Sequence, residues 1–317
     1  MRASAPLLLI GALLTGCGDE GSDEPATTSA SGAFPVTLKH AFGSTTIREQ
    51  PKRIVAVGYN EDDFVLALGV KPVGVRDFIG TFDEDDRVWA RDLYAGAKPE
   101  KVGGDELELE KVAALQPDLI MGVYSFIDEE MYEKLSQIAP TVAPTKATAA
   151  DTWQDQTLIT GRALGREKQA QEVVDRVEGR FAKAREEHPE FEGKTLAYAL
   201  LGEGGANTYS LEATDLRTQL FTSLGFEMTE STGEISRERM SRLDEDVLVT
   251  AGLTDEQEAE VPVLPALDVV EEGRQVNLGD FSTEVNGAIG YSSPLSLSGA
   301  LDLIVPQLAE AAGKESS

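Results

Sequence analysis

The stretch REKQAQEVVDRVEGRFAKAREE, residues 166–187, decides the fold, because its apolar residues recur at three- and four-residue spacing. That spacing predicts an amphipathic α-helix. At the α-helical rise the helix would extend for about 33 Å, and Pro189 would discourage its continuation. A helix of this length can connect two lobes. Its predicted buried positions are Ala170, Val173, Val174, Val177, Phe181 and Ala184.

The chain before this helix is similar to the chain after it. Residues 109–121 read LEKVAALQPDLIM and residues 237–249 read RERMSRLDEDVLV, and each segment predicts a short helix followed by a buried strand. Residues 51–57 and 193–199 each open their half with a basic residue and an apolar strand. We therefore predict an internal duplication. The alternative is one large α/β domain whose strands look alike, because buried strands draw on few residue types.

The order of strands and helices predicts the α/β fold class, with parallel sheets. Strands are expected at residues 53–58, 73–75, 119–123 and 141–144, and again at 194–201, 247–250 and 275–278. Helices are expected at 61–68, 109–115, 131–138, 152–164, 216–224 and 295–312. We predict two pseudo-repeated α/β lobes, residues 34–165 and 189–317, joined by a single long helix at 166–188. A ligand cleft would lie between the lobes.

The N-terminus predicts export and lipid anchoring. A basic start and a short apolar run make residues 1–16 a secretory signal peptide, too short to span a membrane. Leu14-Thr15-Gly16-Cys17 matches the bacterial lipobox, so Cys17 would be the first mature residue, lipidated at the outer face of the cytoplasmic membrane. Cys17 is the only cysteine in the sequence, which excludes an internal disulfide. The alternative is a free cysteine at an ordinary cleavage site. With Cys17, the small polar residues up to position 33 would form a flexible tether.

Charge and residue content exclude several functions. The 56 acidic and 28 basic residues give a formal charge of −28, which disfavours nucleic-acid binding. The chain has two histidines, His40 and His188, and no Gly-x-Ser-x-Gly motif, so neither a hydrolase triad nor a site for a bare metal ion is expected. We predict no catalytic residues, no metal ligands and no cofactor.

A binding site for an intact organic chelate needs neither a catalytic triad nor a cluster of metal ligands. It needs aromatic faces for stacking and a few polar donors. In open parallel sheets, ligands bind beyond the carboxyl ends of the strands. Most of the candidates follow predicted strands or lie in loops near them in sequence. The candidate ligand-binding residues are Tyr59, Asn60, Arg76, Trp89, Tyr124, Tyr209, Arg217, Arg237, Phe281 and Tyr291.

The chain resembles the iron-siderophore (FecB/FhuD-like) substrate-binding lipoproteins of bacterial ABC importers. The resemblance lies in PKRIV at 51–55, LGVKPVGV at 68–75, QPDLI at 116–120, QIAPTV at 137–142 and SPLSL at 293–297. It implies two lobes joined by one stiff helix, a ferric siderophore in the cleft, and delivery to an ABC permease dimer with its ATPase. The protein would be a monomer that touches the membrane only through its anchor. Hydroxamate, carboxylate and catecholate chelates all stay open, and haem, cobalamin or a sensing role are the alternatives.

In the resembling family, one glutamate per lobe docks onto permease arginines. Glu110 and Glu238 occupy equivalent positions of the repeat, near the start of equivalent helices. The resemblance therefore implies a docking role for both. The alternative is that each carboxylate only complements the dipole of its own helix.

Overall fold

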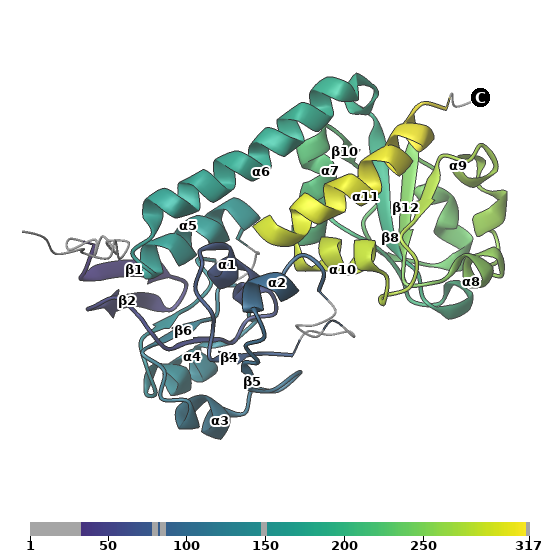
Figure 1. Cartoon of the computed structure of the whole chain (residues 1–317). Helices are drawn as coiled ribbons and strands as arrows, with labels where there is room; N and C mark the ends of the chain where they lie inside the picture. Colours follow the sequence, from purple (N-terminus) through teal and green to yellow (C-terminus); the bar gives the residue numbers. More distant parts are fainter. Residues whose placement is uncertain (1–32, 78–81, 83–86, 147–150, 315–317) are drawn as a thin grey trace, which may run out of the picture. The chain divides into compact units, whose positions relative to one another are not determined.

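Two β-sheets with helices packed around them organise the computed structural model (Figure 1). The structure describes residues 33–77, 82, 87–146 and 151–314. The predictions for residues 1–32, including the signal peptide, Cys17 and all but the last residue of the tether, lie outside the described residues. Residues Ala33–Ser317 belong to one compact unit.

The first sheet is parallel throughout, as predicted. Its strand order is β5-β4-β3-β6-β7, with β3 (Ile54–Ala56) in the middle. All three residues of β3 are buried, which explains why the sequence reads there as a continuous apolar run. The other strands are β4 (Gly74–Val75), β5 (Glu100–Lys101), β6 (Leu119–Met121) and β7 (Thr141–Val142). The accompanying helices are α1 (Glu61–Ala67), α2 (Arg91–Tyr94), α3 (Leu109–Ala114) and α4 (Glu129–Ser136).

The second sheet is mixed, so the prediction of parallel strands in both lobes is wrong here. β8 (Thr195–Leu200), β10 (Glu227–Met228), β12 (Val247–Ala251) and β13 (Gln275–Asn277) pair in parallel. β9 (Thr208–Ser210) runs antiparallel to β8, and β11 (Gly233–Ile235) antiparallel to β9. The glycine-rich segment after β8 permits this reversal of direction. Gly204, Gly205 and Asn207 have φ values of 58°, 76° and 51°, and this left-handed backbone turns the chain back along β8.

The remaining elements complete the architecture. Before the first sheet, β1 (Val36–His40) and β2 (Gly43–Ile47) form an antiparallel hairpin that the sequence did not predict. The segment predicted as a helix in the second repeat is η4 (Arg237–Leu243), a 3-10 helix. The others are α5 (Trp153–Ala163), η1 (Pro189–Phe191), η2 (Glu203–Gly205), η3 (Leu216–Thr218), α7 (Gln219–Leu224), α8 (Asp255–Ala259), η5 (Leu264–Ala266), α9 (Asp268–Glu271), α10 (Glu284–Tyr291) and α11 (Pro294–Ala312).

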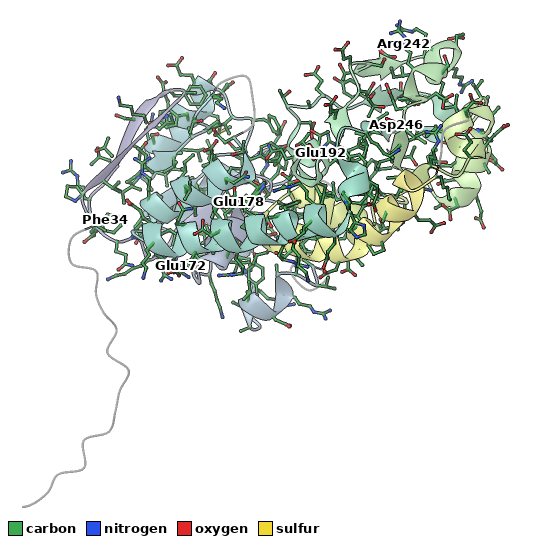
Figure 2. The ribbon with its side chains drawn as sticks, turned by 90° about the horizontal axis from the view of Figure 1, so that it is seen from above. Phe34, Glu172, Glu178, Glu192, Arg242 and Asp246 are labelled. Carbon is green, nitrogen blue, oxygen red and sulfur yellow. The ribbon has the colours of Figure 1, made fainter. Side chains whose placement is uncertain are left out.

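The predicted amphipathic helix is α6 (Glu167–Glu187), and all six of its predicted apolar positions are buried. Ala170 and Val173 belong to an apolar cluster with residues of the first sheet. Val174, Val177 and Phe181 belong to a cluster with residues of the second sheet. The opposite face is polar: Glu172 and Glu178, labelled in Figure 2, are exposed. One helix therefore contributes to the cores beneath both sheets.

Candidate functional site

A cavity of about 490 Å³ lies at the carboxyl ends of several strands. Tyr59 comes shortly after β3, Tyr124 after β6, and Leu200 ends β8, so the position agrees with the rule for open parallel sheets. The volume is in the range of small-molecule sites. The lining residues come from both halves of the chain and are mostly aromatic or small: Tyr59, Phe82, Tyr124, Phe126, Tyr198, Leu200, Arg217, Phe281, Asn286, Gly287 and Gly290.

Three rings from the first half form one wall of the cavity. The centroid of the Tyr124 ring lies 4.9 Å from that of Phe126 and 6.5 Å from that of Tyr59. The backbone N–H of Tyr59 donates to the carbonyl oxygen of Tyr124 at 3.0 Å, which joins the two loops. Phe126 is 74% exposed and has a φ of 52°, a strained conformation for an aromatic residue. An apolar ring held in this way suits contact with a ligand.

A buried carboxyl group holds this wall from behind. An oxygen of Glu61 accepts a hydrogen bond from the backbone N–H of Tyr124. Burial raises the pKa of Glu61 to about 8, so the group is protonated at neutral pH. Glycine at residue 58 leaves room for this carboxyl group, because a Cβ there would lie 1.4 Å from the other oxygen of Glu61.

The second half contributes the only cation among the described lining residues, Arg217. Its Nε and one Nη each donate to a different oxygen of Asp215 at 2.8 Å, which makes a bidentate pair. Burial, together with the nearby Asp215 carboxylate, raises the pKa of Tyr124 to about 12, and burial also raises the pKa of Tyr198. Both phenols therefore stay protonated and can donate hydrogen bonds to a ligand.

Two predicted polar residues lie behind the cavity. Arg76 donates to the carbonyl oxygens of Gly104, Asp105 and Ser125 at 2.6, 2.8 and 3.0 Å. Its guanidinium carbon is 4.1 Å from the centroid of the Tyr59 ring, so Arg76 supports that ring. Asn60 is fully buried and donates to the carbonyl oxygen of Tyr291 at 2.9 Å.

Tyr291 and Trp89 pack together behind Phe82 and are not among the lining residues. We predicted Tyr291 to lie in a segment leading to the last helix, but it is the last residue of α10 and 2% exposed. Its ring centroid lies 5.5 Å from that of Trp89. The indole N–H of Trp89 donates to Asp63 at 2.8 Å. Both side chains therefore serve packing in this structure.

Two further candidates lie outside the cavity lining. Tyr209 was expected in a loop but lies on β9, where it is 43% exposed. Arg237 is the exposed first residue of η4. Of the ten predicted residues, the structure brings together Tyr59, Tyr124, Arg217 and Phe281 around the cavity.

Sequence reasoning missed several lining residues. Phe126 carries a signal, because it lies two residues after Tyr124 beyond a strand end, but Tyr198 reads as an ordinary core position of a buried strand. Gly287 and Gly290 lie three residues apart on α10, which was not predicted. A Cβ at Gly287 would meet the Phe82 ring at 2.3 Å, so glycine here leaves room for that ring. No pattern in the sequence indicated that Asn286, Leu200 or Phe82 would line a cavity.

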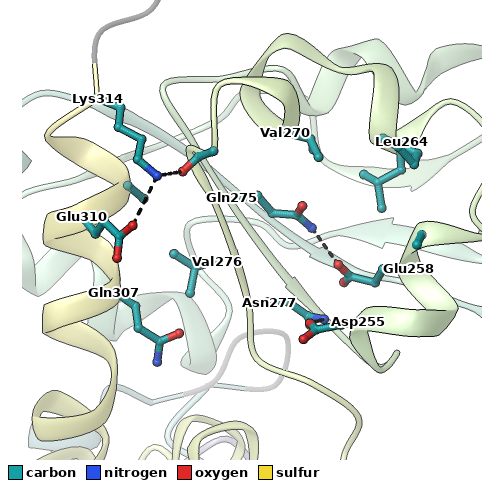
Figure 3. Close-up of a pocket in the computed structure, with 14 residues that line it drawn as sticks. Asp255, Glu258, Leu264, Val270, Gln275, Val276, Asn277, Gln307, Glu310 and Lys314 are labelled. Atoms are coloured by element: carbon teal, nitrogen blue, oxygen red, sulfur yellow. Dashed lines mark hydrogen bonds and ion pairs between the residues drawn. The ribbon is translucent and has the colours of Figure 1, made fainter.

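A second pocket of about 540 Å³ is lined by residues of α8, β13 and α11 and of the segments between α8 and β13 (Figure 3). No aromatic residue is among its described lining residues. Its lysine, Lys314, donates to the carbonyl oxygen of Gly273 at 2.8 Å and pairs with Glu310 at 3.4 Å. Burial raises the pKa of Glu258, which accepts from Gln275 at 2.7 Å, to about 7. This polar pocket offers no surface for stacking a chelate. Nowhere in the described ranges do three or more metal-binding side chains gather at one point.

Comparison with known proteins gives matches over most of the chain. The family described as periplasmic binding protein matches residues 54–264. The crystal structure of a periplasmic solute-binding protein from Mycobacterium smegmatis is 33% identical, with a TM-score of 0.80, and covers 88% of this chain and 99% of that chain. PiaA of Streptococcus pneumoniae, solved in complex with ferrichrome, is 26% identical with a TM-score of 0.75 over 87% of this chain and 98% of that one. A probable siderophore-binding lipoprotein of Bacillus subtilis, YfiY, is 28% identical over 252 residues, 74% of each chain.

Proposed function

The chain belongs to the periplasmic binding protein family, a non-enzymatic class of transport component, and we propose that it is the substrate-binding component of an ABC importer for ferric siderophores. The observation that carries this proposal is the cavity of about 490 Å³, lined by aromatic rings from both halves of the chain. Such a surface can stack on an organic chelate. The ferrichrome complex of PiaA and the description of YfiY as a probable siderophore-binding lipoprotein support the same class of ligand.

The two halves would act as lobes that hold the chelate between them. We propose residues 34–165 and 189–317 as the lobes, with α6 within 166–188 as their stiff connection. The apolar residues of α6 in the clusters of both sheets support this. Bending a continuous helix breaks backbone hydrogen bonds, so closure around the ligand would be small. Solution scattering with and without ligand tests it, and a large drop in radius of gyration would count against a stiff connection.

Removing the exposed aromatic rings is expected to weaken chelate binding without unfolding the protein. Phe126 is 74% and Phe281 52% exposed, so each alanine variant loses little buried surface. Each ring should contribute roughly two- to tenfold in affinity, the value of an aromatic stacking contact. Tyr209→Ala is the matched control, since Tyr209 is also exposed but lies outside the lining.

Fluorescence titration against a panel of ferric siderophores, haem and cobalamin measures this. Tight binding of haem or cobalamin with no binding of any ferric siderophore would contradict the proposed function. Equal affinities of the Phe126, Phe281 and Tyr209 variants would show that the cavity is not where the ligand binds.

We propose that Glu110 and Glu238 dock the protein onto its permease. Glu110 lies in the first turn of α3 and Glu238 in the first turn of η4, and both side chains are exposed. Hydrogen bonds to charged groups contribute about 1.5–3 kcal/mol each, so the Glu110→Ala, Glu238→Ala double variant should lose about 100-fold or more in affinity for the permease.

The readouts are siderophore uptake and ATPase stimulation in the reconstituted importer, with siderophore affinity unchanged. The control is the Glu133→Ala, Glu256→Ala double variant, which removes one exposed glutamate from α4 and one from α8. Full transport by the Glu110/Glu238 variant would contradict the docking role. The two carboxylates would then only complement the dipoles of their own helices.

We propose that Cys17 anchors the mature chain to the outer face of the cytoplasmic membrane, as a monomer. The lipobox supports this, and YfiY is described as a lipoprotein. Within the described ranges, none of the helices has the length and apolar character to cross a bilayer. The mass of the N-terminal peptide from membrane-extracted protein tests it, because an unmodified Cys17 would contradict lipidation.

A further inference from the structure

The cavity carries almost no net positive charge. Among its described lining residues, Arg217 alone is cationic, and Asp215 binds one edge of its guanidinium through Nε and one Nη. The side chains of the two are only 28% and 25% exposed. The Arg217 charge lowers the pKa of Asp215 despite its burial, so the pair is fully ionised and neutral as a unit at pH 7.

Two other arginines, Arg76 and Arg87, lie outside the cavity lining. Arg76 keeps its charge, but it lies outside the lining, against the Tyr59 ring, and donates to three backbone carbonyl oxygens. Arg87 pairs with Asp62 and Asp63 at 2.5 and 2.9 Å. The positions between 33 and 317 that the structure does not describe contain no lysine or arginine in the sequence. These positions therefore add no cationic side chain to those of the described residues.

Ferric siderophores differ in charge by their chemistry. Three singly charged hydroxamates neutralise Fe³⁺, whereas three doubly charged catecholates leave a threefold negative complex, and ferric citrate complexes are anionic. An anionic chelate could still reach N–H groups of Arg217 that Asp215 does not use, but it would meet a pair without net charge. Displacing Asp215 would separate a largely buried pair and leave an uncompensated charge. The formal charge of −28 adds long-range repulsion. The protonated phenols of Tyr124 and Tyr198 can donate to the oxygen rim of a neutral hydroxamate complex, so binding of that class does not require a cation.

We infer that this cavity selects a ferric chelate without negative charge, the tris-hydroxamate class, and that Asp215 sets this selection by neutralising Arg217. The inference rests on the proposed function. Asp215 acts through Arg217 and does not itself line the cavity. It is therefore a specificity-determining residue that no pattern in the sequence indicated.

Asp215→Asn tests the inference directly. Asparagine keeps an oxygen that can accept from the backbone N–H of Arg217, as Asp215 does at 2.9 Å, so η3 keeps its cap. The probes are a neutral ferric tris-hydroxamate, a ferric tris-catecholate and ferric citrate. Wild-type protein should bind the hydroxamate about 100-fold or more tightly than the catecholate. The variant should bind the catecholate about tenfold more tightly than wild type does, and the gain should shrink as ionic strength rises.

The control is Glu272→Gln, which removes one negative charge from a similar pair with Arg274, two residues apart and outside the cavity. Its selectivity should equal that of wild type. Binding of no ferric chelate at all would contradict the proposed function itself. Wild-type preference for the catecholate or citrate complex would overturn the charge inference while leaving the proposed function standing. Unchanged selectivity of Asp215→Asn would overturn the role of Asp215.

Discussion

Replacing Arg87 by alanine is expected to destabilise the fold by about 3–5 kcal/mol, the cost of breaking a buried ion pair by removing one partner. Arg87 is 2% exposed, and its two Nη atoms lie 2.5 Å from Asp62 and 2.9 Å from Asp63. Although burial acts to raise it, the pKa of Asp62 is lowered by the Arg87 charge. Without Arg87, two neighbouring buried carboxylates would have no cation.

Arg87, Asp62 and Asp63 belong to a larger hydrogen-bond network, so Arg87→Ala should lower the free energy of unfolding by more than the loss of one contact would. Asp63 accepts from Ser293 at 2.6 Å, and Asp62 from Tyr94 at 2.6 Å. Ser293 is the N-cap of α11, so the network ties α1 to a helix more than 200 residues later in the chain (Figure 1). Removing the arginine should therefore loosen the contact between α1 and α11 as well.

Urea unfolding followed by circular dichroism measures the free energy of unfolding. Arg180→Ala is the matched control, because Arg180 pairs with Asp302 but the two side chains are 36% and 71% exposed. Exposed pairs contribute about 0–1 kcal/mol. Equal losses in the two variants would show that the buried network contributes no more than a surface pair.

This network also shows why part of the fold could not be read from the sequence. Periodicity predicted α6 and α11, and continuous apolar runs predicted β3, β8 and β12, because each pattern is local. The partners of Asp63 lie 24, 26 and 230 residues away, and no local pattern connects them. The mixed second sheet was missed for a related reason. A glycine-rich segment permits a chain reversal, but it does not specify one.

The candidate site also contains residues that local sequence patterns predicted and residues that they did not. Tyr59 and Tyr124 could be predicted, because ligands in open sheets lie beyond strand ends and these residues come shortly after β3 and β6. Arg76 also lies just after a strand, yet the loop at Gly104 and Asp105 supplies carbonyl oxygens that hold its guanidinium. The sequence shows which side chains approach the sheet edge. It does not show which of them already have partners, and Asp215 escaped notice for that reason.

Glu61→Gln is expected to change how stability depends on pH. The pKa of Glu61 is raised by burial from its ordinary 4.5 to about 8. Between these values the folded chain holds a proton that the unfolded chain has lost. The wild-type free energy of unfolding should therefore fall as pH rises, by about 1.4 kcal/mol per pH unit, and level off above the folded pKa.

Glutamine carries no such proton and can still accept from the backbone N–H of Tyr124, so its contribution should not change with pH. From pH 6 to pH 8, the free energy of unfolding of Glu61→Gln should gain about 2–3 kcal/mol on that of wild type. Other groups titrate in this range, including Glu258, whose pKa burial raises to about 7, but they do so in both proteins and cancel in the difference. Glu110→Gln removes a carboxylate from an exposed position and should give a constant difference. A constant difference for Glu61→Gln as well would mean that Glu61 is ionised at neutral pH, and that a charged group lies behind the Tyr124 wall of the cavity.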